Sequence, residues 1–134
     1  MSNTKATGVA YLDPEFSTCY ATEEIGYAAG AQGTVTQLTD KATGVTLNKS
    51  AGRITMNGAS LAGNTAVSFT LNNSFISAND TIIVCISGGA TEAAYTTYVS
   101  SMTSGSAKIT LRNLTSGALL EAVIINFSII HGAS

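Results

Sequence analysis

Residues 33–61, GTVTQLTDKATGVTLNKSAGRITMNGASL, alternate apolar and polar side chains in short segments separated by turn-forming residues. Val45 and Leu47 would share one face of a strand, and Ile54 and Met56 would share one face of the next. A repeat of two residues is the period of a β-strand, whereas a helix would show an apolar stripe with a period near 3.6 residues. The dipeptide Asn57-Gly58 is a strong turn signal. The stretch therefore predicts paired strands and no helix.

The same pattern continues to residue 131 and predicts an all-β body of about eight strands. We expect them near residues 34–38, 45–48, 54–56, 67–71, 82–86, 95–99, 109–112 and 119–130. Strands of this length at this spacing are typical of a two-sheet sandwich or a barrel, and we favour an antiparallel two-sheet sandwich. The strand count favours a jelly-roll-like arrangement. Greek-key sandwiches give the same pattern, so the order of the strands stays open.

The segment Ile82 to Ile86 is continuously apolar. Such a run is typical of a central strand that is covered on both faces. We therefore expect Cys85 to be a small buried residue and not a reactive thiol. Cys19 and Cys85 have no secretory context in the sequence, and we expect both to be reduced.

The final segment has two apolar faces. Val123, Ile125, Phe127 and Ile129 would form the core face, but the opposite face carries Leu120, Ile124 and Ile130. A strand with one face in water does not normally carry large apolar side chains there. Two explanations remain open: a central strand covered by loops or by the N-terminal segment, or an oligomer interface formed by Leu120, Ile124 and Ile130.

Residues 1–32 differ from residues 33–134, and we interpret them as an extended N-terminal arm attached to the β-sandwich body. The arm has one Lys against four acidic residues, a net charge of −3, and it shows no strand pattern. It also holds four of the nine aromatic residues, namely Tyr11, Phe16, Tyr20 and Tyr27. Disordered tails are poor in aromatic residues. These four side chains therefore predict a segment that becomes ordered on a partner or on its own body.

Charged residues make up only 10% of the chain and the net charge is −2. A net charge this small gives only weak electrostatic repulsion between copies of the chain, so it protects the surface poorly against self-association. A soluble monomer with neutral polar faces would have the same composition, but we favour a surface covered by neighbouring subunits. The six basic residues are scattered, so no nucleic-acid partner is expected. We also expect no signal peptide and no membrane-spanning segment.

No combination of residues points to catalysis. The single histidine, His131, is not accompanied by a nucleophile or a carboxylate that the sequence would place beside it. Two cysteines and one histidine at wide spacing do not form a metal signature. The glycine-containing segments lack the lysine of a phosphate loop. We therefore expect a protein that is not an enzyme, with no catalytic residues, no metal and no cofactor.

Three parts of the sequence resemble a family of small β modules in tailed bacteriophages: residues 33–61, residues 68–84 (SFTLNNSFISANDTIIV) and residues 112–132 (RNLTSGALLEAVIINFSIIHG). The segments TVTQ, GVTLNK and ITMN occur in the order typical of that family. The resemblance covers most of the body and none of the arm. Members occur as free-standing virion proteins and as modules of tail or head fibres, and the family has no catalytic residues.

The resemblance implies a structural or adhesive role. For a free-standing module it implies a capsid decoration (cement) protein, a homotrimer on the outer capsid surface of a virion assembled in the host cytoplasm. The partners would be the major capsid protein, contacted by the arm residues Tyr11, Phe16, Tyr20 and Tyr27, and other copies of the chain. The alternative is a tail- or head-fibre module that binds a host receptor or glycan through its loops, with Tyr95 and Tyr98 as platforms for a sugar.

Overall fold

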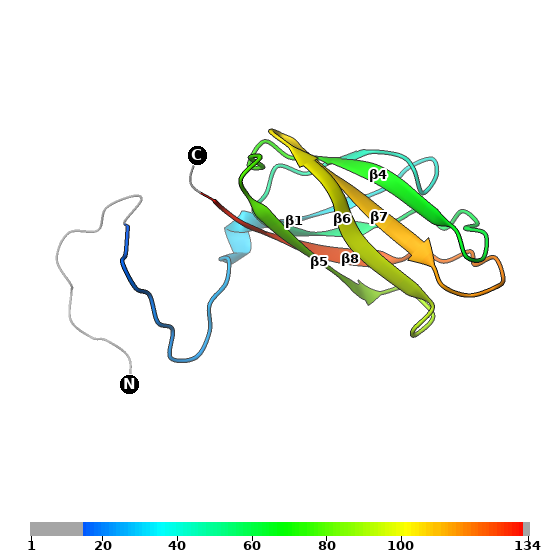
Figure 1. The fold of residues 1–134 in the computed structure, drawn as a ribbon, viewed down its shortest axis with the longest axis horizontal. Helices are drawn as coiled ribbons and strands as arrows, with labels where there is room; N and C mark the ends of the chain where they lie inside the picture. The colour runs from blue at the N-terminus through cyan, green and yellow to red at the C-terminus, as the bar shows by residue number, and fades with distance from the viewer. Residues whose placement is uncertain (1–14, 133–134) are drawn as a thin grey trace.

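The structure, a computed structural model, describes residues 15–132 and contains eight strands and one short 3₁₀ helix among them. The prediction of an all-β protein with about eight strands in two sheets is confirmed (Figure 1). The elements in chain order are η1 (Ala29–Ala31), β1 (Gln32–Thr36), β2 (Val45–Thr46), β3 (Ala51–Thr55), β4 (Ala66–Asn72), β5 (Thr81–Gly88), β6 (Tyr95–Thr103), β7 (Ser106–Asn113) and β8 (Ile124–Ile130).

The strands form two sheets of four that pack face to face. The first sheet has the order β1-β3-β8-β5, and the second sheet has the order β2-β4-β7-β6. Most neighbours are antiparallel, as expected, but β1 pairs with β3 and β2 pairs with β4 in parallel. The parallel pairs arise where the chain crosses between the sheets before it returns, because strands that are not joined by a hairpin are free to run in the same direction.

The core lies between the two sheets and is built from the alternate residues that the sequence pattern marks. Ile54 on β3 and Ile125 on β8 face inward from the first sheet, and Phe69 on β4 and Ile109 on β7 face them from the second. All four side chains are fully buried. Burial of apolar area is the main force that holds two sheets together, so the alternation both shapes the strands and joins the layers.

The prediction for residues 82–86 is wrong in one respect. The segment forms β5, but β5 is the edge strand of the first sheet and not a central strand. Ile82 faces the core, whereas Ile83 and Cys85 lie exposed on the outer face. The expectation that Cys85 is buried is therefore wrong as well. Cys19 and Cys85 are both free and exposed.

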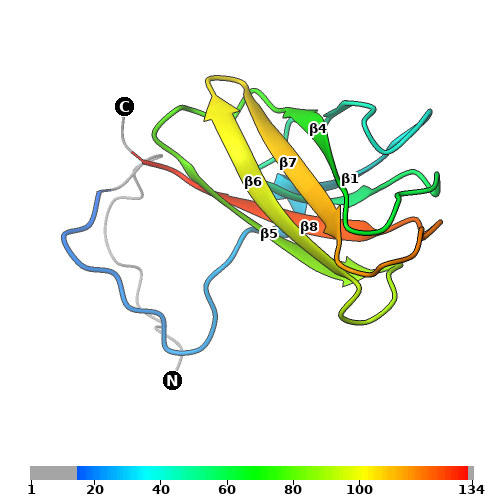
Figure 2. The same ribbon diagram turned by 45° about the vertical axis from the view of Figure 1, so that its right-hand side comes forward.

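The central position belongs to β8, which lies between β3 and β5. This strand begins at Ile124, five residues later than the sequence pattern predicts. The preceding residues are extended but outside the sheet: Leu119 forms a bridge with Leu61, and the carbonyl of Val123 accepts a hydrogen bond from the Met56 amide. β8 ends beside the segment that leads into β1, so the arm and the C-terminal end of β8 lie at the same end of the sandwich (Figure 2).

Candidate functional site

The arm leaves the body as an extended segment with its apolar side chains in solvent. Residues 15–30 are all exposed, and Figures 1 and 2 show residues 15–24 running away from the sandwich. The exposed fractions are 69% for Phe16, 90% for Tyr20 and 88% for Ile25. Tyr11, the fourth aromatic residue of the arm, lies outside the described residues. These exposed apolar side chains make the arm a candidate binding segment.

The base of the arm is fixed to its own body by polar contacts. The Tyr27 hydroxyl donates to the carbonyl oxygen of Ile129 on β8. The Gln32 amide donates to the Tyr27 carbonyl at 3.1 Å, and the Lys49 ammonium donates to the Gly30 carbonyl at 2.9 Å. Tyr27 therefore has a partner within the chain, whereas Phe16 and Tyr20 remain available to another molecule.

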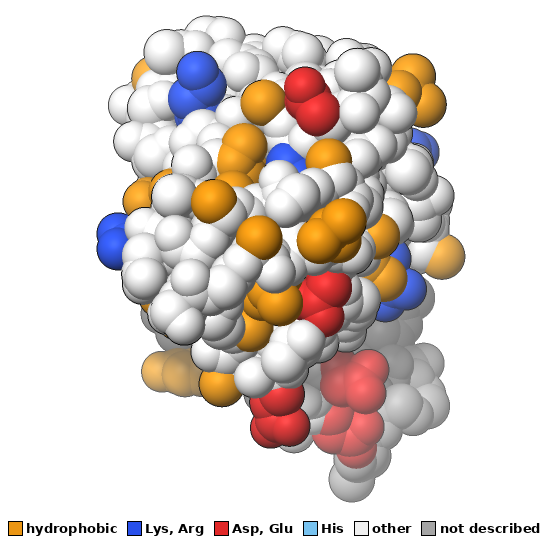
Figure 3. Space-filling view, turned by 90° about the vertical axis from the view of Figure 1, so that its right-hand side faces the viewer, with side chains coloured by type: hydrophobic (Ala, Val, Ile, Leu, Met, Phe, Trp, Pro, Cys, Tyr) orange, Lys and Arg blue, Asp and Glu red, His pale blue; other side chains and the backbone are white. Residues whose placement is uncertain are grey.

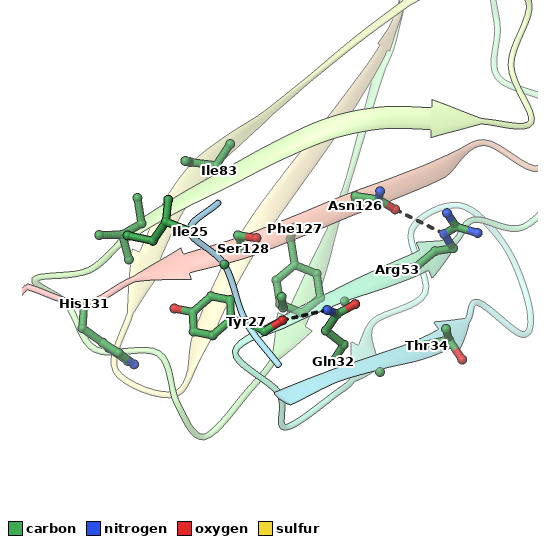
Figure 4. Close-up of a pocket in the computed structure, with 15 residues that line it drawn as sticks. Ile25, Tyr27, Gln32, Thr34, Arg53, Ile83, Asn126, Phe127, Ser128 and His131 are labelled. Atoms are coloured by element: carbon green, nitrogen blue, oxygen red, sulfur yellow. Dashed lines mark hydrogen bonds between the residues drawn. The ribbon is translucent and has the colours of Figure 1, made fainter. Parts of the chain in front are cut away.

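The outer face of the first sheet is hollowed into a groove of about 1020 Å³ beside the base of the arm. The strand register places Gln32, Ala51, Ser128 and Ile83 in one row across the four strands, and Thr34, Arg53, Asn126 and Cys85 in the next. Figure 4 shows Ile25 and Tyr27 at one end of the groove and Arg53 and Thr34 toward the other. The groove is lined by Ile25, Gly26, Tyr27, Gln32, Gly33, Thr34, Ala51, Gly52, Arg53, Ile83, Asn126, Phe127, Ser128, Ile130 and His131.

The groove combines apolar walls with positive charge. Ile83 and Ile130 are 53% and 55% exposed, and they are the largest exposed apolar side chains that the body contributes to it. The Nε of Arg53 donates to the Asn126 side-chain oxygen at 3.3 Å, a bond that uses one of the five donors of the guanidinium. Among residues 15–132, no Asp or Glu lines the groove. It therefore suits an extended segment that carries both apolar and acidic side chains.

The three residues expected at an oligomer interface lie in different settings. Ile130 lines the groove at the end of β8. Ile124 starts β8 on the same outer face and is half-buried, opposite Thr55. Leu120 is exposed in the connection before β8 and belongs to no strand. Ile124 and Ile130 therefore lie on the same outer face of the first sheet, whereas Leu120 does not. The role of all three residues at an oligomer interface stays a prediction.

His131 is paired with a carboxylate that sequence reasoning did not place beside it. Its Nδ1 lies 3.0 Å from Oδ1 of Asp80, which precedes β5 and whose side chain is fully buried. The same carboxylate accepts bonds from the Ser77 amide and hydroxyl, both at 2.8 Å, and from the Gly132 amide at 3.1 Å. The Ser77 amide, followed by the Ser77 hydroxyl and His131, lowers the pKa of Asp80 to about 2. These bonds hold the end of β8 to the loop before β5.

The Asp80 pairing predicts an acid-sensitive part of the stability. The pKa of Asp80 is lower in the folded chain than its ordinary value of 3.8, so its stabilising effect is complete above about pH 4 and is lost as the pH falls toward 2. Asp80→Asn is expected to lower the stability at pH 7 and to flatten its dependence on pH between 4 and 2. Urea unfolding at a series of pH values measures this slope. An Asp80→Asn protein with the wild-type slope would contradict the prediction.

The outer face of the second sheet carries hydroxyl groups around an exposed tyrosine. The Thr110 hydroxyl lies 2.7 Å from that of Ser68 and donates to that of Ser100 at 3.0 Å. Tyr98 pairs with Thr110 in the register and is about half exposed. Tyr95, the other expected sugar platform, is buried, so that expectation is wrong for Tyr95. At the end of the sandwich away from the arm, apolar side chains form separate small groups among polar ones (Figure 3).

Among residues 15–132 no group of three or more His, Cys, Asp or Glu side chains is placed to hold a metal ion. The helices of this part of the chain include none with the length and apolar character to cross a membrane. No family model, no curated protein and no solved structure matches this chain. The arm and the groove at its base are therefore the strongest candidate site, on the geometry alone.

Proposed function

We propose that this chain is a bacteriophage virion structural protein, a capsid decoration protein that binds the outer surface of the head as a homotrimer and stabilises the shell. The observation that carries the proposal is the arm: a compact sandwich extends a segment with Phe16 and Tyr20 in solvent. Aromatic side chains bury a large area at a small entropic cost, which suits them to anchor a protein on a neighbouring subunit. The segments that resemble phage β modules support the same proposal.

The mechanism is the burial of surface across several capsid subunits. Each contact adds binding free energy to the assembled shell, and that energy opposes the internal pressure of the genome. Three chains in one trimer bind together, so the second and third contacts form at a high effective concentration. The trimer can then bind the capsid tightly even if the contact made by each single arm is weak.

The proposal is tested with capsids from virions that lack this protein. The full chain is expected to co-sediment with these capsids and to raise the temperature at which they release DNA. A variant without residues 1–24 keeps the Tyr27 contact with the body, so it should fold, but it should bind at least tenfold more weakly. The exposed Leu114→Ser serves as a control for loss of an apolar side chain outside the arm. Equal binding by the full and truncated chains would rule out the role of the arm.

A second candidate is a fibre module that binds a host receptor or glycan. The observation in its favour is Tyr98, a half-exposed ring among hydroxyl groups, with Lys108 and Arg112 two residues to either side of Thr110 on the neighbouring strand. Aromatic faces and hydroxyl groups are suited to sugar binding. Adsorption of the purified protein to host cells, lost in Tyr98→Ala, together with no binding to capsids, would favour this function over decoration.

A further inference from the structure

The groove on the first sheet is covered by its own arm at one end only. Tyr27 lies at the end near His131, where its hydroxyl binds the Ile129 carbonyl, whereas Ile25 beside it remains 88% exposed (Figure 4). From there the chain leads outward, and residues 15–24 run away from the sandwich (Figures 1 and 2). The part of the groove around Arg53 is therefore open to a segment from another molecule.

The arm itself has the chemistry that this open part requires. Residues 20–25, YATEEI, present the exposed apolar side chains of Tyr20 and Ile25 on either side of Glu23 and Glu24. The groove presents Ile83, which is 53% exposed, and the guanidinium of Arg53, and none of the residues among 15–132 that line it is an Asp or a Glu. Apolar area would be buried against apolar area, and two negative charges would lie near a cation. Charge complementarity of this kind selects the partner and its orientation.

We propose that residues 20–25 of a second copy of this chain occupy the groove, so that neighbouring chains exchange arms. Six extended residues span about 20 Å, and a row across four strands is about 14 Å wide, so the segment is long enough to cross the sheet. An arm that enters the next chain's groove makes a head-to-tail contact, and such contacts close into a ring when the rotation allows it. This arm exchange would be the contact between chains in the proposed homotrimer, and the inference rests on that part of the proposed function. Phe16 and the residues before it are left to contact the capsid.

The inference is tested by complementation with the purified chain, without capsids. One variant lacks residues 1–24 and keeps an intact groove; the other, Ile83→Glu, keeps the arm but places a negative charge in the groove. Size-exclusion chromatography with light scattering should find the full chain as an oligomer and each variant as a monomer. An equimolar mixture should form a heterodimer, because it contains one usable arm for each usable groove. Arg53→Glu is a second blocked variant with the same expected behaviour, in case Ile83→Glu fails to fold.

The control is Leu114→Glu, which places the same charge at a side chain of similar exposure outside the groove and should leave the oligomer intact. A monomeric full chain, an oligomer that persists without residues 1–24, or a mixture that remains monomeric would each overturn the exchange. Capsid binding is a separate readout. If the chain exchanges arms but does not bind capsids, this inference stands and the decoration function is rejected. If the chain binds capsids as a monomer, the decoration function stands and the arm exchange is rejected.

Discussion

Replacing Phe69 with alanine is expected to lower the free energy of unfolding by about 3 to 5 kcal/mol, the range found when a large aromatic core side chain is removed. Phe69 is fully buried on β4, pairs with Ile109 on β7 and packs against the first sheet across the core. The loss includes the transfer energy of the ring and the cavity that rigid neighbouring strands cannot close. Chemical denaturation followed by circular dichroism measures the change.

Phe75→Ala is the matched control, because the same side chain is removed from a half-exposed position in the connection between β4 and β5. Its cost should stay below about 1 kcal/mol, since little apolar area returns to water. The difference between the two variants should be easy to measure, because the whole free energy of unfolding of a domain of this size is only about 5 to 15 kcal/mol. Similar losses in both variants would show that Phe69 is not at the centre of the core.

The alternation of apolar and polar residues was enough to predict the two layers. The alternation in residues 54–56 and 119–130 places Ile54 and Ile125 on the apolar face of their strands, and both are fully buried. This works because successive side chains of a strand point to opposite faces, so a strand with one buried face has an apolar residue at every second position. The order of the strands in a sheet produces no local sequence pattern. The parallel pairs of β1 with β3 and β2 with β4 were therefore not predicted.

The strand β5 shows why an apolar run can mislead. Ile82 to Ile86 has the pattern of a strand covered on both faces, yet Ile83 and Cys85 are exposed at the sheet edge. An apolar run reports only that both faces avoid water, and it does not tell whether a layer of the same chain or a second molecule covers them. Ile83 lies in the groove that we propose for a neighbouring arm, which would supply the missing cover.

The candidate site was predicted in part. The aromatic and acidic composition of the arm predicts a segment that binds a surface. The structure leaves Phe16 and Tyr20 in solvent, and the binding of the arm stays a prediction. Tyr27 differs because its hydroxyl meets a carbonyl 102 residues later. Contacts at such separations follow from the topology, so no local pattern indicates them. The same holds for Asp80 with His131, 51 residues apart.

A buried lysine joins three connections at one end of the sandwich, and it carries the second large expected effect. Lys41, between β1 and β2, is only 3% exposed. Its ammonium donates to the carbonyl oxygens of Asn57, which follows β3, and of Glu121, which precedes β8. Burial lowers the pKa of Lys41, and the nearby Glu121 carboxylate opposes that effect. The Glu121 carboxylate in turn accepts the Thr91 hydroxyl at 2.6 Å, and hydrogen bonds from Thr91 lower its pKa.

Lys41→Met is expected to cost about 3 kcal/mol, because methionine keeps the apolar stem but leaves two part-buried carbonyls without this donor and the Glu121 carboxylate without the charge of Lys41. Lys108→Met, at an exposed lysine on β7, should change the stability by less than about 0.5 kcal/mol. Denaturant unfolding of the two variants, and of Lys41→Met combined with Glu121→Gln, separates the causes. If the unpaired charge dominates, Glu121→Gln restores part of the loss; if the carbonyls dominate, it restores none. A Lys41→Met protein as stable as the wild type would contradict the structural role of Lys41.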